Sequence, residues 1–479
     1  MLKKILISFC FIIICLIIII LFNTIRFSSK QINVSSISMA NVDSSAINHL
    51  QNAIHFKTIS FSDSSKFDSN EFIGFRNFLE KTFPLVHSKL KREIINKYSL
   101  LFEWRGKSTY AKPIILMAHQ DVVPIEEETL QMWQSDPFSG LLKDNFICGR
   151  GSVDDKINLI SILEATERLL KEGYQPEKTI YFVFGHDEEI SGMKGAKPIA
   201  ELLQARNIKA EFVIDEGGFI TNKEVPGMKK PVALIGTAEK GYMSIELLVN
   251  IKGGHSSMPA KETSIDVLSK SIIKLRKKPF PAHFSESTLG FIENVGPEMP
   301  FIQKMAFANF WLFKPLIINI YEKSNGGNAL IRTTIVPTIL KSGIKDNVVP
   351  SVATAVINLR ILPGSNSQDI LKQLKNTIDD DRVIISTIGY VHEPSKTTNI
   401  NSPGYKKVVK VIRSNMGGTI TTPFLMLGAT DSRHFKNISE TILKFSPMVD
   451  PIGFHGINEK VSVDSYKRCI GFYYQLMKE

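Results

Sequence analysis

The sequence of 479 residues predicts an α/β protein with a mostly parallel sheet flanked by helices and a smaller α+β domain inserted into it. Apolar runs at residues 114–118, 179–184 and 211–214 are typical of buried parallel strands. Helical patterns separate these runs, which is the order of a strand–helix–strand sheet. Segments 241–249 and 354–362 instead alternate between apolar and polar residues, as strands with one exposed face do. A chain of this length is also too long for one core, so two domains are expected.

The domain boundaries follow from these changes of pattern. We expect a main domain in two parts, residues 47–239 and 393–479, with residues 240–392 inserted between them. In the main domain a further strand is predicted at 100–104, and helices at 72–82, 157–170, 196–205, 405–415 and 462–478. The inserted domain is predicted to hold two antiparallel strands, helices at 265–275 and 367–377, and irregular sequence up to residue 331.

The N-terminus carries a candidate membrane segment. Lys3 and Lys4 precede an apolar run, Ile5–Phe22, that contains no charged residue and is about long enough to cross a bilayer. Because no small-x-small cleavage motif follows, we favour an uncleaved signal anchor at residues 1–27 over a cleaved secretory signal. The flanking lysines predict a cytoplasmic N-terminus, with the rest of the chain on the exoplasmic side: a vacuole or lysosome lumen, a periplasm or the extracellular space. Cleavage would instead give a secreted protein.

Several smaller features bound the class of protein. Residues 28–46 are polar and rich in serine, and we expect them to form a stalk. Sequons at Asn33 and Asn437 are candidate glycosylation sites. Cys148 and Cys469 are the only cysteines of the folded part, so a disulfide framework is excluded and one bridge remains open.

The net charge of +11 raises the question of nucleic-acid binding. The lysines and arginines are scattered, and no dense basic block with interleaved aromatic residues is present. We therefore expect a solvated basic surface and no nucleic-acid partner. The apolar content of 43% and the charged content of 22% are those of a globular protein.

Polar side chains follow the buried strands at the point where each strand ends. His119 and Asp121 follow the first run, and strand alternation points both to the same side. Glu188 and Glu189 follow the second run, and Asp215 follows the third. Ligands and catalytic groups of parallel sheets lie at the carboxyl ends of the strands, so we expect these groups to meet at one edge.

Two more segments add to this set. Asp154 and Asp155 lie just before a helical pattern, where an acidic residue is the usual cap. Capping explains Asp155, whereas Asp154 lies on the strand side of the turn and can project a ligand. His455 lies in a loop before the last helix. Two imidazoles and several carboxylates form a suitable ligand set for two zinc ions with one bridging carboxylate, and cobalt or manganese is also compatible.

Six ordered motifs are similar to those of a known family. They are HQDVVP at 119–124, GRGSVDDK at 149–156, HDEE at 186–189, IDEGG at 214–218, GGHSSMP at 253–259 and FHGINE at 454–459. Over residues 45–479 the chain resembles the co-catalytic dizinc hydrolases that include aminoacylase, carboxypeptidase G and carboxypeptidase S. The apolar N-terminus and the segment ATDSRHF favour the branch of carboxypeptidase S and the secreted N-acyl-amino-acid amidases. The resemblance implies a dizinc exopeptidase-like fold whose inserted domain is a lid.

The resemblance also implies a metal-ligand set of five residues. Asp154 would bridge two zinc ions. His119 and Asp215 would complete one site, and Glu189 and His455 the other.

Other residues would act on the substrate or on the ligands. Asp121 would orient the imidazole of His119, and Glu188 would be the general base that takes a proton from the attacking water. His255 would stabilise the oxyanion, in some relatives from a partner subunit, which is compatible with a homodimer through the lid domain.

Three further assignments concern the binding of the substrate. Asn347 and Arg360 would contact it from the lid. Arg433 would bind its free carboxylate, for which a guanidinium fork is well suited.

The expected function is metal-dependent hydrolysis of an amide bond next to an amino acid with a free carboxylate, as in a carboxypeptidase acting on small peptides. The alternative is an N-fatty-acyl-amino-acid hydrolase or synthase. The apolar segment 280–321 would then line an acyl pocket or contact the membrane, although core packing explains it equally well. A third hypothesis, an inactive binding protein that retains the fold, would lack a ligand or the base, and none is missing from the sequence.

Overall fold

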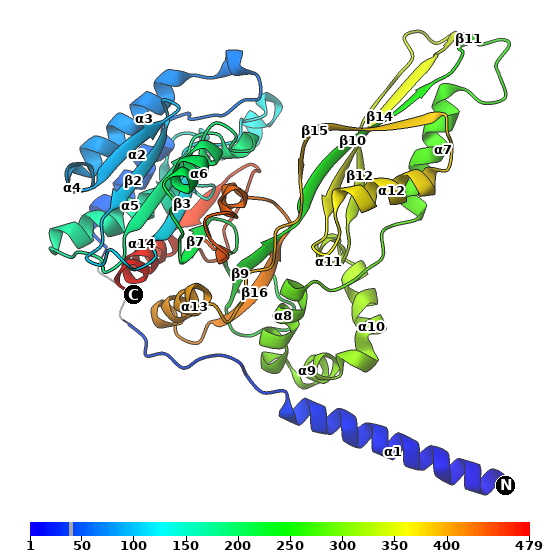
Figure 1. Ribbon diagram of the computed structural model, residues 1–479, viewed down its shortest axis with the longest axis horizontal. Helices are drawn as coiled ribbons and strands as arrows, with labels where there is room; N and C mark the ends of the chain where they lie inside the picture. Colours follow the sequence, from blue (N-terminus) through cyan, green and yellow to red (C-terminus); the bar gives the residue numbers. More distant parts are fainter. Residues whose placement is uncertain (38–41) are drawn as a thin grey trace.

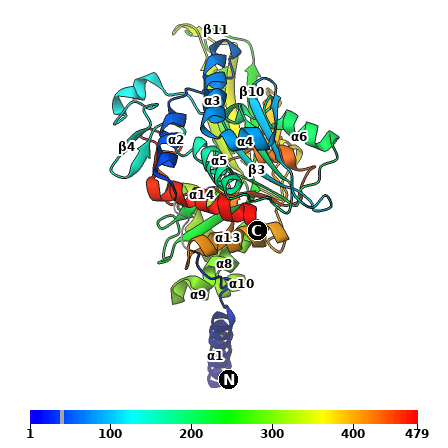
Figure 2. The same ribbon diagram turned by 90° about the vertical axis from the view of Figure 1, so that its left-hand side faces the viewer.

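The computed structural model describes residues 1–37 and 42–479, and its main part is a nine-stranded sheet with helices on both faces (Figure 1 and Figure 2). Eight strands follow the order β1 (Lys91–Ile95), β2 (Ser99–Trp104), β6 (Ile180–Gly185), β3 (Ile114–His119), β7 (Phe212–Asp215), β17 (Ile442–Lys444), β9 (Val232–Glu239) and β16 (Ile420–Met426). The ninth, β8 (Ile220–Thr221), pairs with β9.

The sheet is mixed, so the prediction of a mostly parallel sheet is correct only in part. β3 is parallel to both of its neighbours, β6 and β7, and β7–β17 and β9–β16 are also parallel pairs. β2 is antiparallel to β1 and to β6, and β8 and β17 are antiparallel to β9. β1 turns back directly into β2 because Asn96 and Lys97 adopt positive φ, which suits a tight hairpin turn.

β3 is buried on both faces, which explains its uninterrupted apolar sequence. Leu116 belongs to the core that includes α5 (Lys156–Lys171) and α14 (Val463–Lys478), whereas Ile115 and Met117 pack with α6 (Ala196–Ala205). The core that contains α5 and α14 also includes residues of four more helices: α2 (Ser44–Ile54), α3 (Ser69–Thr82), α4 (Pro84–Lys89) and α13 (Pro403–Asn415). The strand–helix–strand prediction is confirmed at this centre, and it places the carboxyl ends of β3, β6 and β7 side by side.

A second, four-stranded sheet extends away from the main sheet as an arm (Figure 1). Its strands are all antiparallel, in the order β12 (Thr334–Ser342), β14 (Val352–Ile361), β10 (Gly241–Asn250) and β15 (Val383–His392). Helices α7 (Ser264–Lys277) and α12 (Ser367–Ile378) pack on it around a separate core. The two predicted strands are present as β10 and β14, but the sequence does not signal β12 and β15, which contain Pro337 and Gly389.

Residues 286–331 are mostly helical, so the prediction of irregular structure is wrong. They form α8 (Glu286–Val295), α9 (Phe301–Ala308), α10 (Phe310–Glu322) and α11 (Asn325–Ile331). Ser285 and Ser324 cap α8 and α11 by accepting backbone hydrogen bonds, which is a normal role for serine. Pro315 lies inside α10, where a proline usually argues against a helix.

Helix α1 (Leu2–Arg26) is the one described helix that is long and apolar enough to cross a membrane, and a signal sequence near an N-terminus meets the same criteria. The residues directly after α1 contact the main part of the protein. The Oε1 atom of Gln31 accepts a hydrogen bond from the amide of Thr421 at 2.8 Å and from Arg413 at 3.3 Å. The described part of the predicted stalk therefore lies against the main sheet, and its residues 38–41 lie outside the described residues.

A small sheet of β4 (Leu141–Lys143), β5 (Phe146–Cys148) and β18 (Lys460–Ser462) joins two distant parts of the chain. Since the loop with Asp154 follows β5 and the loop with His455 precedes β18, this pairing brings the two loops together. Cys148 and Cys469 are free thiols, so the open question of a bridge is answered in the negative for this pair.

Candidate metal centre

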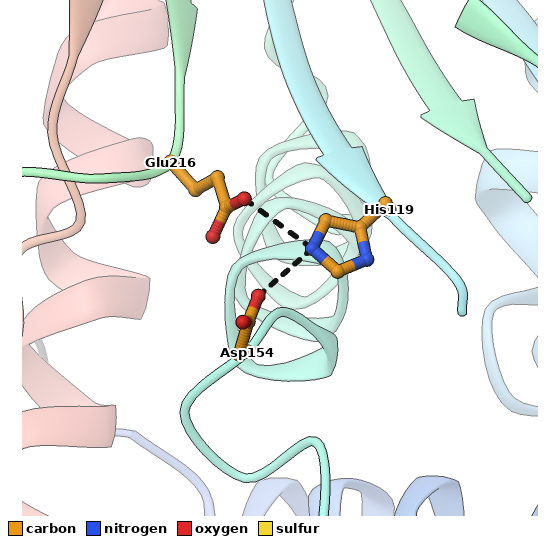
Figure 3. Close-up of side chains that lie close together, drawn as sticks. All are labelled: His119, Asp154 and Glu216. Atoms are coloured by element: carbon orange, nitrogen blue, oxygen red, sulfur yellow. Dashed lines mark hydrogen bonds and ion pairs between the residues drawn. The ribbon is translucent and has the colours of Figure 1, made fainter. Parts of the chain in front are cut away.

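Two groups of metal-ligating side chains meet at the carboxyl ends of β3, β6 and β7. The first consists of His119, Asp154 and Glu216, which point toward one another in Figure 3. His119 Nε2 lies 2.9 Å from Asp154 Oδ1 and 3.4 Å from Glu216 Oε1. All three side chains are buried, and an imidazole with two carboxylates is a suitable ligand set for a divalent ion.

The second group consists of Asp154, Glu189 and His455. His455 Nε2 lies 2.6 Å from Asp154 Oδ2 and 3.2 Å from Glu189 Oε2. Asp154 thus presents one carboxylate oxygen to each group, which is the arrangement of a bridging ligand. This placement agrees with the role that the family resemblance implies for Asp154.

The structure does not place Asp215 in either group. Its Oδ2 atom accepts a hydrogen bond from the amide of Ser432 at 2.7 Å, and its Oδ1 atom accepts one from the amide of Glu216 at 3.0 Å. β7 ends at Asp215, and the backbone turns at Gly217, whose φ of 133° favours glycine. The carboxylate that faces His119 is therefore that of Glu216, which the sequence interpretation missed.

Asp121 supports both the first ligand and the turn after β6. Its backbone oxygen lies 2.9 Å from His119 Nδ1, and its carboxylate Oδ1 lies 3.4 Å from the same nitrogen. The carboxylate also accepts the hydroxyl of Ser60 at 2.6 Å and the amides of Glu188 and Glu189, each at 3.1 Å. These contacts orient the imidazole so that its Nε2 atom faces Asp154 and Glu216, and the orienting role of Asp121 stays a prediction.

Asp155 has a different role from the predicted one. Its side chain makes no capping hydrogen bond to α5, so capping does not explain it. The Oδ2 atom instead accepts the backbone amide of His119 at 3.3 Å, while Oδ1 accepts the amide group of Asn158. The peptide bond between Asp154 and Asp155 is cis.

A buried ion pair that the sequence interpretation missed joins the two ligand-bearing loops. Arg150 Nη1 lies 2.6 Å from Glu459 Oε2. Glu459 Oε1 accepts the amides of Gly151 at 3.0 Å and Val153 at 2.8 Å, and Arg150 Nη2 donates to the oxygen of Gly456 at 3.0 Å. Local sequence could not reveal this pair, because its members are 309 residues apart.

Glu188 lies beside the ligand groups without belonging to either. Burial raises its pKa well above the usual value, and the charge of Asp431 raises it further, although His119 lowers it. Arg433 Nη1 lies 3.8 Å from Glu188 Oε1. The Nε atom of Arg433 is buried and has no hydrogen-bond partner among the described residues, so the guanidinium retains a donor for a ligand.

The charge balance of the centre fits bound cations. Hydrogen bonds to Asp154 and Glu189 raise the pKa of His455 to about 11, and burial together with the charge of Asp154 raises that of Glu216. The Oε1 atom of Glu189 is buried without a hydrogen-bond partner among the described residues. Buried carboxylates need cations or hydrogen-bond donors, and two divalent ions would meet that need. The buried carboxylates around the two histidines are Asp121, Asp154, Asp155, Asp215 and Glu216.

The predicted residues of the inserted segment lie on the arm at different distances from the centre. Arg360 is half-buried on β14 and stacks over the ring of Tyr242 at 4.8 Å, where β10 and β14 leave the main part. Burial lowers the pKa of Arg360, and the nearby charge of Arg433 lowers it further. Arg360 and Arg433 therefore lie near each other at the base of the arm.

His255 and Asn347 lie at the far end of the arm, where β11 (Gly254–His255) pairs with β13 (Val348–Val349) (Figure 1). Both are exposed, and the backbone amide of Ser256 donates to the backbone oxygen of Asn347 at 3.2 Å. His255 Nδ1 is bonded to the hydroxyl of Ser257 at 2.7 Å. The structure brings these two residues together but not to the metal centre.

Known proteins are similar to this chain in sequence and in fold. The profile described as "Peptidase family M20/M25/M40" matches residues 115–479. "Probable carboxypeptidase S-like 2" of Dictyostelium discoideum is 41% identical over 444 residues, which cover 91% of this chain and 85% of that protein. "N-fatty-acyl-amino acid synthase/hydrolase PM20D1" of Homo sapiens is 39% identical over 438 residues, covering 90% and 86%. The crystal structure of the M20 family metallo-carboxypeptidase Sso-CP2 from Sulfolobus solfataricus has a TM-score of 0.69 at 18% identity, covering 91% of this chain and 99% of that one.

Proposed function

The chain belongs to the peptidase family M20/M25/M40 and is a metal-dependent hydrolase, and we propose that two zinc ions bind at the centre described above. The proposal rests on Asp154, whose two oxygens face His119 and His455. His119, Asp154 and Glu216 would hold one ion. Asp154, Glu189 and His455 would hold the other. Cobalt or manganese fits the same nitrogen and oxygen ligands.

The residues of the centre suggest how an amide bond is hydrolysed. When bound, the two ions would lower the pKa of a water molecule and polarise the scissile carbonyl. Glu188 takes a proton from the attacking water and returns it to the leaving amine, because it lies beside both ligand groups without belonging to either. Asp121 positions this base through its hydrogen bond to the Glu188 amide, and it orients His119 at the same time.

The substrate is an amide whose amine side is an amino acid with a free carboxylate. Arg433 is the cation beside Glu188 and would bind that carboxylate, with Arg360 at the base of the arm as a second contact. A carboxypeptidase acting on small peptides and an N-fatty-acyl-amino-acid hydrolase both fit this description. The two relatives described above carry names of these two kinds.

The arm would act as a lid. His255 and Asn347 lie at its exposed end, so they reach a metal centre only if the arm moves or if they serve the centre of a second copy. Among the described residues, the edge strand β12 pairs only with β14, and it exposes Val336 and Leu340. An unpaired apolar edge is suited to pairing with another chain, which favours a homodimer through the arm.

Helix α1 would anchor the protein, with the main part on the exoplasmic side of the membrane. Secretion after cleavage of α1 is the alternative. The N-terminal sequence of the mature protein decides between them.

Removal of metal is expected to abolish hydrolysis and to lower the midpoint of thermal unfolding (Tm). The buried carboxylates of the centre lose their counter-charges when the ions leave, so the folded state becomes less stable. We would dialyse the protein against phenanthroline, then measure activity, Tm and metal content, and add zinc back. Full activity with less than one metal ion per chain would contradict the proposal and favour a metal-independent hydrolase.

Blocking the substrate carboxylate is expected to lower kcat/KM by about 10- to 100-fold, because a hydrogen bond to a charged group contributes about 1.5–3 kcal/mol. The panel contains Gly-Leu, N-oleoyl-phenylalanine and the C-terminal amide of each. Arg433→Lys should reduce the difference between acid and amide, whereas Arg105→Lys, at an exposed position on the main part, should leave it unchanged. Equal kcat/KM for acids and amides would refute carboxylate recognition, and the ratio for the two acids decides between peptidase and N-acyl hydrolase.

A further inference from the structure

Helices α9 and α10 expose a row of large apolar side chains. Leu312, Leu316 and Ile320 recur at every fourth position of α10 and so lie along one side of the helix, while Ile317 is buried. Large apolar side chains that are exposed together on neighbouring helices mark a candidate contact with a partner or a membrane. Six residues form this surface, which we call the hairpin face: Phe301, Ile302, Trp311, Leu312, Leu316 and Ile320.

The hairpin face lies next to the last turns of α1, the candidate membrane helix. Asn309, at the junction of α9 and α10, is fully buried, and its Nδ2 atom donates to the oxygen of Ile20 at 3.1 Å. Asn23 Nδ2 in turn donates to Asn309 Oδ1 at 2.9 Å, and Thr24 is buried at the same contact. Figure 1 shows α9 where α1 meets the rest of the molecule. These directional hydrogen bonds hold α9 in one orientation on α1.

The length of α1 places this contact at the boundary of a bilayer. The apolar run Ile5–Phe22 rises about 27 Å at about 1.5 Å per residue, and the hydrocarbon core of a bilayer is about 30 Å thick. Ile20 and Asn23 therefore lie where α1 leaves the core, and α9 packs at that level. Apolar side chains at this depth are buried among headgroups and acyl chains, as in interfacial helices.

The charges around the hairpin face suit an anionic lipid surface. Lys304, Lys314 and Lys323 lie within or directly after α9 and α10. The single acid of these two helices, Glu322, is paired with Arg332. The surface is thus positively charged, and lysines near a membrane are attracted to acidic headgroups by about 1 kcal/mol each.

The segment after α1 makes further contacts with the main part. The Phe27 ring packs against Gly296, where an added Cβ would lie 2.6 Å from the ring. Lys30 Nζ lies 2.6 Å from Glu293 Oε2, and Gln31 binds the backbone of Thr421. The segment that follows α1 therefore contacts the main part at Gly296, Glu293 and Thr421.

We propose that the hairpin face is a second membrane contact, which inserts into the headgroup and acyl boundary of the anionic bilayer that α1 crosses. The proposal rests on the membrane span proposed above, and it adds a two-point attachment with a fixed orientation. The partner is the lipid surface itself, because Asn309, between α9 and α10, is hydrogen-bonded to Ile20 and Asn23 at the end of the apolar helix.

Photolabelling of the full chain tests the proposal. The protein is placed in vesicles of phosphatidylcholine and phosphatidylserine that include a phospholipid with a diazirine on its acyl chain, and labelled peptides are identified by mass spectrometry. We expect label in residues 301–320 as well as in α1. β12 is the internal control, because Val336, Ile339 and Leu340 are exposed apolar residues on the arm.

Each pattern of label has one meaning. Label in α1 alone, or equal label in β12, would overturn the membrane contact of the hairpin face. Label in none of these segments would refute the membrane span itself.

Matched variants separate this proposal from the proposed enzymatic function. The triple variant Leu312→Ser, Leu316→Ser, Ile320→Ser should lose most of the label in α10, whereas Val336→Ser, Ile339→Ser, Leu340→Ser should keep it. The α10 triple variant should cleave a water-soluble substrate at the wild-type rate, so a defect in the metal centre would not imitate the effect.

Fluorescence provides a second measurement of the same contact. Trp311 is 59% exposed, whereas Trp104 is buried. Brominated acyl chains should quench the wild-type fluorescence, and Trp311→Phe should lose that quenching. Unchanged quenching in Trp311→Phe, or full labelling of the α10 triple variant, would overturn the proposal.

Discussion

Replacement of Glu188 by glutamine is expected to lower kcat by about 10²- to 10⁴-fold, the range that general acid–base catalysis supplies, with little change in metal content or KM. Glu188 belongs to neither ligand group, and its backbone amide is held by Asp121. Glutamine keeps the size and the polar contacts of the side chain but cannot accept a proton. The defect should therefore be confined to the chemical step, which kcat, KM and metal analysis measure together.

Two variants with the same substitution control this experiment. Glu189→Gln, one position further on, removes a proposed ligand of the second group and should lose metal as well as activity. Glu201→Gln, at an exposed position on α6, should behave as wild type in every measurement. A Glu188→Gln protein with full activity would refute the assigned base, and one that loses as much metal as Glu189→Gln would make Glu188 a ligand instead.

The centre of the fold could be predicted because its physical signals are local. The apolar run of β3 has no polar interruption, since both of its faces are covered by helices. It ends at His119, whose imidazole lies in the site as the position at a strand end predicts. The edges of the sheet could not be predicted in the same way, because strand direction at β2 depends on a turn at Asn96 and Lys97 whose sequence is not a standard hairpin signal.

The choice between Asp215 and Glu216 as the acid beside His119 could not be predicted from the local sequence. Asp215 and Glu216 are adjacent acids at the end of a strand, and successive side chains of a strand point to opposite sides. The acid that points toward His119 is determined by the residue at which the strand ends and by the turn at Gly217. Neither the strand end nor the turn geometry can be predicted from the sequence. The Arg150–Glu459 pair was invisible for another reason, since only the folded chain brings its members together.

The helices of residues 286–331 could not be predicted because the composition of this segment is typical of loops. Proline and asparagine normally mark loops, yet Pro315 lies inside α10 and Asn309 is a buried contact with α1. Such a use of polar residues follows from tertiary contacts with a helix nearly 300 positions earlier in the chain. The same contacts are the basis for the inferred membrane surface.

Substitution of three acids tests which of them bind metal. We expect Asp154 to bind both ions, Glu216 to bind one, and Asp215 to bind neither. Asp154→Asn should lose both metal ions and all measurable activity, because both of its oxygens face a histidine. Glu216→Gln should lose the ion of the His119 group and retain the one held by Glu189 and His455. The measurements are metal content per chain at fixed free zinc, activity, and circular dichroism as a check of folding.

Asp215→Asn distinguishes the structural assignment from the one that the family resemblance implied. Asp215 holds the amides of Ser432 and Glu216, so its loss should weaken metal affinity by about 10- to 100-fold, as for residues that orient a ligand, and saturating zinc should restore both ions. Glu216→Gln should not be restored in this way. If instead Asp215→Asn permanently loses one ion while Glu216→Gln retains two, then Asp215 is the ligand, and the turn at Gly217 must present a different acid to the bound metal.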